Sequence, residues 1–457
     1  MVQLVYQGEL NFSLTEFIVC AGWLVIIYFF AIWYRGKRGE GNPAYHVFYL
    51  GLTAKIVGAI CFALGYTVVY KGGDTIAYYE TSMSYSKLAL YNPGNFFKAY
   101  FISGNSQEAK INLFDVGYTG MPINYIYVDS KTLFTSKFYT PFLILTGNGY
   151  FACTILVGAL SYIGNWGLYL LFYRKYPEQK WLLAIAILFL PSTLFWTGGL
   201  SKDTITFLFT CSAVYFFYRL IEIKYSTVYL ALFFFCLWIL VAVKPYVILV
   251  MLPAMAIWFL HRFTSKIEKR FIRIIALPLF LIISIAVLLF IFNMFGESMG
   301  KFSVDNALET AVMTQYDLKQ DYYGGNSFDI GDFEPTAMGV LSKFPVATFA
   351  GLFRPTILEV RTPLSLISAI ENIFLLWLCG VLFLRLLLGF FYKGTPMMDM
   401  LKSEPVLIYC LIFTLIFSFM IGLTTSNFGA LVRFKTPMLP FYATAVFVLV
   451  SRGKKLF

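Results

Sequence analysis

Histidine, charge and paired cysteines are scarce in this sequence, and each shortage excludes a class of function. The 457 residues include two histidines, and only 13% of the residues are charged. His46 and His261 stand at the edges of apolar runs, on what the charge pattern indicates is the cytoplasmic side, so a histidine-dependent reaction on the outer face has no candidate. The seven cysteines lie in apolar runs without CxxC spacing, which is typical of small buried side chains rather than of zinc or redox sites.

Apolar residues are what the sequence has in abundance. They make up 59% of the chain, and the mean hydropathy is +0.73. Unbroken apolar runs of about 20 residues recur, each long enough to cross a hydrocarbon core about 30 Å thick, whereas a β-barrel would show alternating segments of about 10 residues. We therefore predict an all-α polytopic membrane protein with about 11 transmembrane helices (range 10–13) in a single transmembrane domain, residues 1–457. The predicted spans are about 15–34, 46–69, 149–173, 181–200, 204–221, 226–243, 246–261, 274–294, 365–390, 405–423 and 437–451.

Lysine and arginine set the predicted orientation. They concentrate at one set of span ends, which the positive-inside rule assigns to the cytoplasm. The N-terminus is then outside and the C-terminus cytoplasmic, and the net charge of +11 reports topology rather than a nucleic-acid partner. Two long loops, about 70–148 and 295–364, fall outside and are rich in tyrosine. Tyrosines beside amides are typical of sugar contact and equally of an interfacial belt, so both interpretations stay open.

The stretch Pro191–Asp203 joins two apolar runs through Gly198-Gly199 and ends on Ser201-Lys202-Asp203. An ionisable side chain at membrane depth costs about 2.5–3.5 kcal/mol on insertion scales, so it usually has a partner or a function. If a helix begins here, its free N–H groups and Lys202 together suit an anion such as phosphate. The alternative is a helix hairpin in which Ser201 is an N-cap and Lys202 extends to the interface.

Four more outer corners carry charge. Asp74 follows Gly72-Gly73 and is either a functional carboxylate or a turn residue; Lys244 precedes a proline and either binds an anion or reaches to the interface. Arg354 has the planar fork that matches phosphate oxygens, but it also stands five residues before Glu359, with which it could form a structural ion pair. The last corner contains Asn427, Arg433 and Lys435.

Three of these stretches resemble bacterial envelope-polysaccharide enzymes, namely the repeat-unit polymerases (Wzy- and EpsG-like) and the GT-C glycosyltransferases. They are Gly72-Gly73-Asp74-Thr75 with its following tyrosines, the Pro191–Asp203 corner, and Asn427-Phe428-Gly429 with the downstream Arg433-Phe434-Lys435. The resemblance implies that Asp74 matches a first-loop acid used as a base or metal ligand. It implies that Lys202, Arg354 and Arg433 match cations that hold a lipid diphosphate. The chain departs from the pattern in having no paired acids in the first loop and no outer-loop histidine.

These observations predict a membrane glycosyltransferase or repeat-unit polymerase acting on polyprenyl-diphosphate-linked sugars at the outer face of the bacterial inner membrane. Its expected partners are that lipid-linked saccharide and membrane lipid, with no nucleic acid, no cofactor and no metal. The candidate residues are Asp74, Asp203 and Glu359 for catalysis, Lys202, Lys244, Arg354, Arg433 and Lys435 for the diphosphate, and Tyr78, Trp196 and Asn427 for sugar contact.

Two alternatives stay open at this point. A transporter or flippase for a lipid-linked glycan is favoured by Lys55, which stands midway along the second predicted span. A non-catalytic scaffold of an envelope complex would need none of the charged corners. Among the three acids, Asp74 is the preferred base, because Asp203 and Glu359 have cations close in sequence that would lower their basicity.

Overall fold

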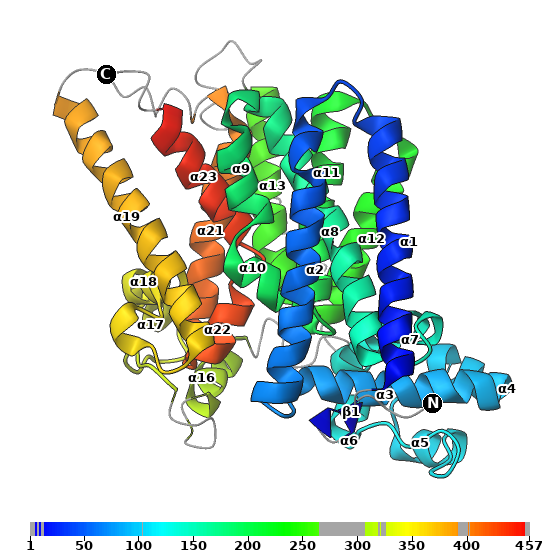
Figure 1. Ribbon diagram of the computed structural model, residues 1–457. Coiled ribbons are helices and arrows are strands. Elements are labelled where there is room, and N and C mark those ends of the chain that lie inside the picture. The colour runs from blue at the N-terminus through cyan, green and yellow to red at the C-terminus, as the bar shows by residue number, and fades with distance from the viewer. Residues whose placement is uncertain are drawn as a thin grey trace. The chain divides into compact units, whose positions relative to one another are not determined.

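The computed structural model describes residues 5–6, 9–10, 13–102, 104–264, 307–318, 320, 326–391, 401 and 403–452, and they are predominantly helical (Figure 1). Among these residues the strands are β1 (Val5–Tyr6) and β2 (Glu9–Leu10), which pair antiparallel. The chain divides into two compact units: unit 1 comprises residues 1–177 and 193–244, and unit 2 comprises residues 178–192 and 245–457. The single transmembrane domain stays a prediction.

Six helices in the described part of the chain are long and apolar enough to cross a membrane, or up to seven if a bent pair near the C-terminus counts as one. The prediction of a multi-pass helical membrane protein is therefore confirmed, whereas the count of about 11 and the orientation of the termini are not. The six are Leu14–Arg38, Pro43–Val69, Tyr150–Lys175, Lys202–Ile223, Ser365–Leu388 and Pro405–Thr424, and the bent pair is Phe428–Phe434 with Leu439–Ser451.

The difference in count has local causes. The run predicted to span 181–200 is two shorter helices, α9 (Lys180–Leu188) and α10 (Pro191–Trp196), since the residue before a proline disfavours helical geometry. The runs 226–243 and 246–261 are helical, as α12 (Thr227–Val243) and the first part of α13 (Pro245–Thr264), but their apolar stretches are shorter than those of the six spanning helices. The predicted span 274–294 lies outside the described residues.

Unit 1 is built from helices α1 to α8, α11 and α12 with short π and 3-10 segments. Their bounds are α1 (Leu14–Arg38), η1 (Pro43–Val47), α2 (Phe48–Leu64), η2 (Gly65–Val69), α3 (Asp74–Tyr91), α4 (Pro93–Phe97), η3 (Lys98–Ile102), α5 (Gln107–Leu113), α6 (Asn124–Val128), α7 (Ser130–Leu145), α8 (Tyr150–Lys175), α11 (Lys202–Tyr218), η5 (Arg219–Ile223) and α12 (Thr227–Val243). The boundary between the units falls inside two elements, η4 (Pro177–Gln179) and α10 (Pro191–Trp196).

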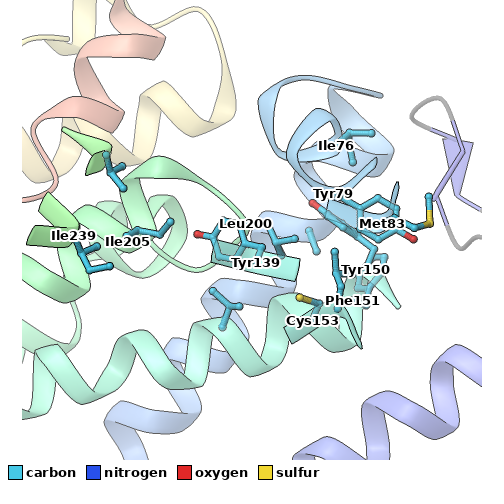
Figure 2. Packing of buried hydrophobic residues seen from close by; sticks show 14 residues of the cluster. Ile76, Tyr79, Met83, Tyr139, Tyr150, Phe151, Cys153, Leu200, Ile205 and Ile239 are labelled. Carbon is cyan, nitrogen blue, oxygen red and sulfur yellow. The ribbon is translucent and has the colours of Figure 1, made fainter. Parts of the chain in front are cut away.

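The predicted outer loop 70–148 is largely helical. Its helices α3 to α7 gather at one end of the long helices of unit 1 (Figure 1), whereas the basic residues of α1 and α8 lie in their last turns, at the other end. A buried cluster joins this cap to α8, α11 and α12 (Figure 2). In it Tyr79 of α3 and Tyr139 of α7 are fully buried beside Tyr150 and Leu200. The cap is thus held to the membrane helices by a shared core.

The Gly198-Gly199 corner is required by close packing against α2. An added Cβ at Gly199 would lie 2.0 Å from the ring of Phe62, and one at Gly198 would lie 2.8 Å from the Cα of Ala59. On the α2 side, a Cβ at Gly58 would lie 2.5 Å from the carbonyl oxygen of Leu194. The backbones therefore approach more closely than any side chain allows, as small residues permit in membrane helix packing.

We expect Gly199→Ala to destabilise the protein by about 1–3 kcal/mol, the usual cost of overpacking a well-filled core. The measurement is the thermal unfolding of the detergent-solubilised protein. Gly36→Ala is the matched control, because a Cβ at Gly36 of α1 meets no atom within 4 Å. Equal stability of the two variants would contradict the close packing of Gly199 against Phe62.

Unit 2 contains the remaining helices, and small residues again bring two of them together. The elements are α9, α13 (Pro245–Thr264), α16 (Ala307–Asp317), α17 (Ala337–Ser342), α18 (Phe344–Phe353), η8 (Ile357–Glu359), α19 (Pro363–Phe391), α21 (Pro405–Thr424), α22 (Phe428–Phe434) and α23 (Leu439–Arg452). A Cβ at Gly351 of α18 would lie 2.0 Å from the carbonyl oxygen of Ser418, and one at Gly422 of α21 would lie 1.9 Å from that of Ala347. Ala347 and Gly351 on α18, and Ser418 and Gly422 on α21, are pairs of small residues four positions apart. Such pairs allow the backbones of two membrane helices to come into contact.

Two carboxylates inside predicted spans satisfy backbone N–H groups of another segment. Glu16 of α1 accepts from the N–H groups of Phe151 (3.0 Å) and Ala152 (3.1 Å) at the start of α8. Glu371 of α19 accepts from the N–H of Ser192 at 3.0 Å. The first N–H groups of a helix have no partner within the helix, so a carboxylate there is favoured by both hydrogen bonding and the helix dipole. These acids have structural roles that sequence reasoning did not assign.

Candidate functional site

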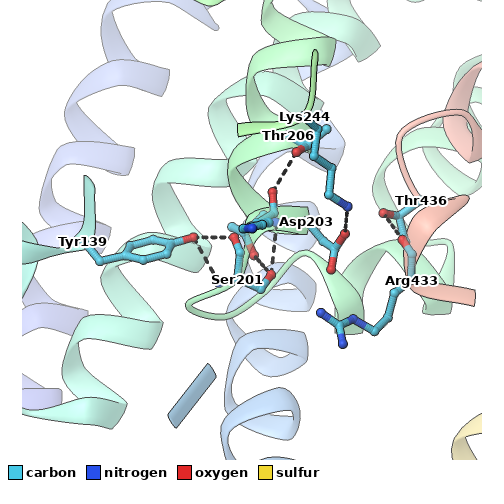
Figure 3. A network of polar contacts seen from close by, with 9 residues as sticks. Tyr139, Ser201, Asp203, Thr206, Lys244, Arg433 and Thr436 are labelled. Atoms are coloured by element: carbon cyan, nitrogen blue, oxygen red, sulfur yellow. Dashed lines mark hydrogen bonds and ion pairs between the residues drawn. The ribbon is translucent and has the colours of Figure 1, made fainter. Parts of the chain in front are cut away.

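The charged corner of unit 1 is fixed by hydrogen bonds from two elements. Ser201 is the N-cap of α11, and its hydroxyl accepts from the N–H of Thr204 at 3.2 Å, as the sequence indicated. The Tyr139 hydroxyl of α7 donates to the carbonyl oxygen of Ser201 (2.7 Å) and accepts from its N–H (3.1 Å), as Figure 3 shows. The start of α11 is therefore anchored to the cap, and this sets where Lys202 and Asp203 lie.

Lys202 points toward the N-terminal end of α7. Its ammonium donates to the hydroxyl of Thr132 at 2.6 Å and lies 3.5 Å from the carboxylate of Asp129. The Lys202 side chain is 22% exposed and that of Asp129 is 52% exposed, so this pair is accessible to solutes. Burial raises the pKa of Asp129, but hydrogen bonds from Thr132 and the charge of Lys202 lower it more, and the pKa is held below its ordinary value.

Asp203 and Lys244 form the second ion pair of the corner, with 2.6 Å between the lysine nitrogen and the carboxylate oxygen (Figure 3). Their side chains are only 1% and 7% exposed. Asp203 was predicted to accept a proton and Lys244 to bind the diphosphate. Both roles require that the substrate reach the side chain, and both side chains are buried. The lysine joins the end of α12 to α11, which is a structural function for the charge at this helix break.

Asp74 is the first residue of α3 and follows Gly73, whose φ of 104° is open to glycine and rarely to other residues. The glycine pair therefore turns the chain sharply and leaves the Asp74 side chain partly exposed. Its charge acts on Lys202, and together with burial and Glu80 it raises the pKa of Tyr125. Asp74 is thus within electrostatic range of Lys202 and Tyr125, and these three residues with Asp129 are named the accessible cluster of unit 1.

In unit 2, Arg354 and Glu359 form an ion pair. The arginine Nε donates to the carboxylate at 2.8 Å, and its NH2 group contacts the same oxygen. Burial raises the pKa of Glu359, but the bonds from Arg354 and from Thr356 lower it further, so the pKa lies below its ordinary value. The guanidinium also stands over the ring of Phe328, at 4.6 Å from its centroid. Arg354 therefore forms the structural ion pair with Glu359 that its position five residues before Glu359 allowed.

The other predicted residues of unit 2 are Lys435, Asn427 and Arg433. Lys435 is fully buried and donates to the side chain of Asn372 and, at 3.4 Å, to the carbonyl oxygen of Arg354. Asn427 caps α22 by accepting from the N–H of Ala430 at 3.2 Å and is 8% exposed. Arg433, drawn in Figure 3, is in the last turn of α22 and partly exposed. The surroundings of Lys435 and Asn427 are those of structural residues.

The proposed sugar contacts are differently placed. Tyr78 is 4% exposed and Trp196 is 6% exposed, so each is largely packed inside the protein. Tyr125 of α6, by contrast, is 58% exposed and lies within electrostatic range of Asp74. Tyr125 is one of the first-loop tyrosines for which sugar contact was left open. Asp129 and Thr132 are partners of Lys202 that sequence reasoning missed. Their one sequence signal is Asp129 itself, an N-cap type of residue at the start of α7.

No group of three or more histidine, cysteine, aspartate or glutamate side chains that could hold a metal occurs among the residues that the structure describes. The acidic side chains of the accessible cluster are carboxylates of the type that Mg²⁺ prefers. They are not gathered into such a group.

Comparison with family models, with curated proteins and with solved structures gave no match.

Proposed function

We propose that this protein is a membrane glycosyltransferase of the repeat-unit polymerase kind, acting on a polyprenyl-diphosphate-linked saccharide at the outer face of the bacterial inner membrane. The observation that carries the proposal is the accessible cluster of unit 1. It combines a carboxylate at a sharp turn, Asp74, with a lysine at a helix N-terminus, Lys202, and with the exposed ring of Tyr125, which is within electrostatic range of Asp74. Asp74 begins the first helix of the cap and Lys202 begins α11, one of the helices long enough to cross a membrane, so the proposed diphosphate site is where the cap and this helix meet.

The contacts of Lys202 suit an exchangeable anion partner. Its distance of 3.5 Å to Asp129 is long for a charge-assisted hydrogen bond, which is usually about 2.7–2.9 Å. A diphosphate oxygen can therefore replace the half-exposed Asp129 carboxylate without opening a buried pair. The N–H groups at the start of α11 and its dipole add to the attraction for the anion.

The reaction then divides between two groups. The bond between the anomeric carbon and the diphosphate oxygen breaks, and the electron pair leaves with the diphosphate, whose growing charge Lys202 stabilises. The acceptor hydroxyl attacks the same carbon, forms the new glycosidic bond and gives its proton to the Asp74 carboxylate. Tyr125 offers a ring face to a sugar. The buried Asp203–Lys244 pair holds the corner in place and takes no part in the chemistry.

The direct test is an assay of the purified protein in proteoliposomes with a polyprenyl-diphosphate-linked oligosaccharide. Formation of longer lipid-linked glycans, with release of polyprenyl diphosphate, is the expected result. Movement of the substrate across the bilayer without any new glycosidic bond would replace the proposal with transport.

The transport alternative drew on Lys55, and the surroundings of Lys55 weaken it. The lysine is fully buried and donates to the carbonyl oxygen of Thr193 at 3.3 Å and to the Thr197 hydroxyl. Its ring contact is with Phe207, 5.3 Å from the centroid. These contacts join α2 to the corner, which accounts for a cation in mid-span without a transport pathway.

We expect activity to persist after chelation, because neither paired acids in the first loop nor a metal-holding group among the described residues supplies a divalent site. The measurement is glycan elongation before and after EDTA treatment, with added Mg²⁺ or Mn²⁺ as the control for reversal. Activity lost in EDTA and restored by either ion would show that Asp74 binds a metal together with other groups.

A further inference from the structure

One segment of the cap, Pro93–Ile102, has an apolar outer surface that the proposed reaction does not use. It is made of α4 and η3, which continue one another without a break. We name this segment the wing.

The inner side of the wing belongs to the protein core. Ala99 is buried in a cluster with Tyr85 of α3 and Tyr127 of α6, and Phe96 and Tyr100 pack against the same cluster. Tyr100 also donates its hydroxyl to the carbonyl oxygen of Lys137 at 2.8 Å. The wing is therefore a fixed part of unit 1, and the direction of its outer side is set.

The outer side of the wing is apolar and basic. Phe97, Phe101 and Ile102 are 54%, 67% and 69% exposed, and Leu90 at the end of α3 is 73% exposed. Lys98 is exposed between them, and the sequence has no acidic residue from position 81 to position 107. Large apolar side chains with a cation and no carboxylate are the composition of helices that lie in the membrane interface.

The level of the wing relative to α1 (Figure 1) indicates which surface it meets. α1 is long and apolar enough to cross a membrane, and near its start Leu14, Phe17 and Ile18 are 77%, 70% and 61% exposed, as expected of a surface that faces lipid. In the view of Figure 1, α4 lies at the level of the first turn of α1 and on its outer side. The wing thus lies at the level at which the exposed apolar surface of α1 begins (Figure 1).

We propose that the wing is a membrane-interface anchor, seated in the headgroup region of the bilayer that α1 crosses. Phe97, Phe101 and Ile102 enter the boundary between headgroups and acyl chains, and Lys98 contacts lipid phosphates. A second copy of this chain is the competing occupant. Lipid is favoured because the wing carries Lys98 and no carboxylate and lies at the level of the first turn of α1 (Figure 1), whereas a self-complementary contact would bring Lys98 near its own copy.

The experiment is site-specific photocrosslinking of the full-length protein in nanodiscs of phosphatidylglycerol and phosphatidylcholine. Benzoylphenylalanine replaces Phe101 in one sample and Phe97 in another. Ile18 of α1 is the positive control, and Glu108, an exposed residue of α5 outside the wing, is the negative control. Mass spectrometry of the labelled peptides measures the fraction that carries a phospholipid.

Lipid adducts at positions 97 and 101 within about twofold of those at position 18, and at least tenfold above those at position 108, are the expected result. Lys98→Glu should lower the share of phosphatidylglycerol among the adducts at position 101. Protein–protein adducts in place of lipid adducts would show contact between copies, and adducts no more frequent than at position 108 would show a surface in water. Either outcome overturns the proposal, and neither depends on glycosyltransferase activity.

Discussion

Asp74→Asn is expected to bind lipid-linked oligosaccharide and to turn it over at least about 100-fold more slowly than the wild type, the lower range for loss of a general base. The amide keeps the shape of the side chain and removes the basic oxygen. Asp74 is the best placed of the three candidate acids. Asp203 is 1% exposed beside Lys244, and Glu359 is bonded to Arg354 and Thr356, so substrate cannot reach the first and the second is a weak proton acceptor.

Binding and turnover are to be measured separately, with a fluorescent lipid-linked oligosaccharide for affinity and chain elongation for rate. Glu108→Gln is the matched control, since Glu108 is an exposed carboxylate in the same cap. It should leave both quantities unchanged. Full activity of Asp74→Asn together with inactivity of a correctly folded Glu359→Gln variant would move the base to unit 2 and leave Asp74 a turn residue.

Hydropathy predicted most of the long helices well, because the need to cover about 30 Å of hydrocarbon leaves a strong signal in the sequence. The prediction failed where a helix is interrupted within an apolar run. Residues 181–200 read as one span, yet the helix ends at Leu188, two residues before the Leu190–Pro191 bond. Hydropathy detects burial in lipid but not the interruption of a helix inside the protein.

The tyrosine-rich segment 70–148 shows a different limit. Its tyrosines divide between a buried core, as with Tyr79 and Tyr85, and an exposed surface, as with Tyr118 and Tyr125. Composition could not separate the two sets, because the choice depends on which face of each short helix meets the membrane helices. Burial therefore removes Tyr79 and Tyr85 from both roles, and for the exposed tyrosines sugar contact and interfacial anchoring both stay open.

The corner at Lys202 and Asp203 was predicted as a single charged site, and the structure separates it into two. Successive residues on a helix point in directions about 100° apart, given 3.6 residues per turn. Lys202 therefore meets Asp129 at the start of α7, whereas Asp203 meets Lys244 at the end of α12. Both partners are distant in the chain, and no local pattern identifies them.

The second large effect is expected for the buried pair. Asp203→Asn or Lys244→Met should each destabilise the protein by about 3–5 kcal/mol, because a single change leaves the other charge in a dry environment without its counterion. Thermal unfolding and the yield of monodisperse protein in detergent are the measurements. The double variant Asp203→Leu with Lys244→Met should recover most of this loss, since replacing a buried ion pair by apolar residues is often neutral or stabilising.

Lys202→Met is the matched comparison, because its partner Asp129 is 52% exposed and such accessible pairs contribute about 0.2–1 kcal/mol. This variant should unfold close to the wild-type temperature and lose diphosphate-dependent turnover. The double variant Asp203→Leu with Lys244→Met should instead recover both stability and activity. If the double variant folds as well as the wild type and is inactive, the Asp203–Lys244 pair takes part in the reaction. If the single changes leave stability unaltered, the pair does not hold the corner, and the division of the site into an accessible cluster and a structural pair is wrong.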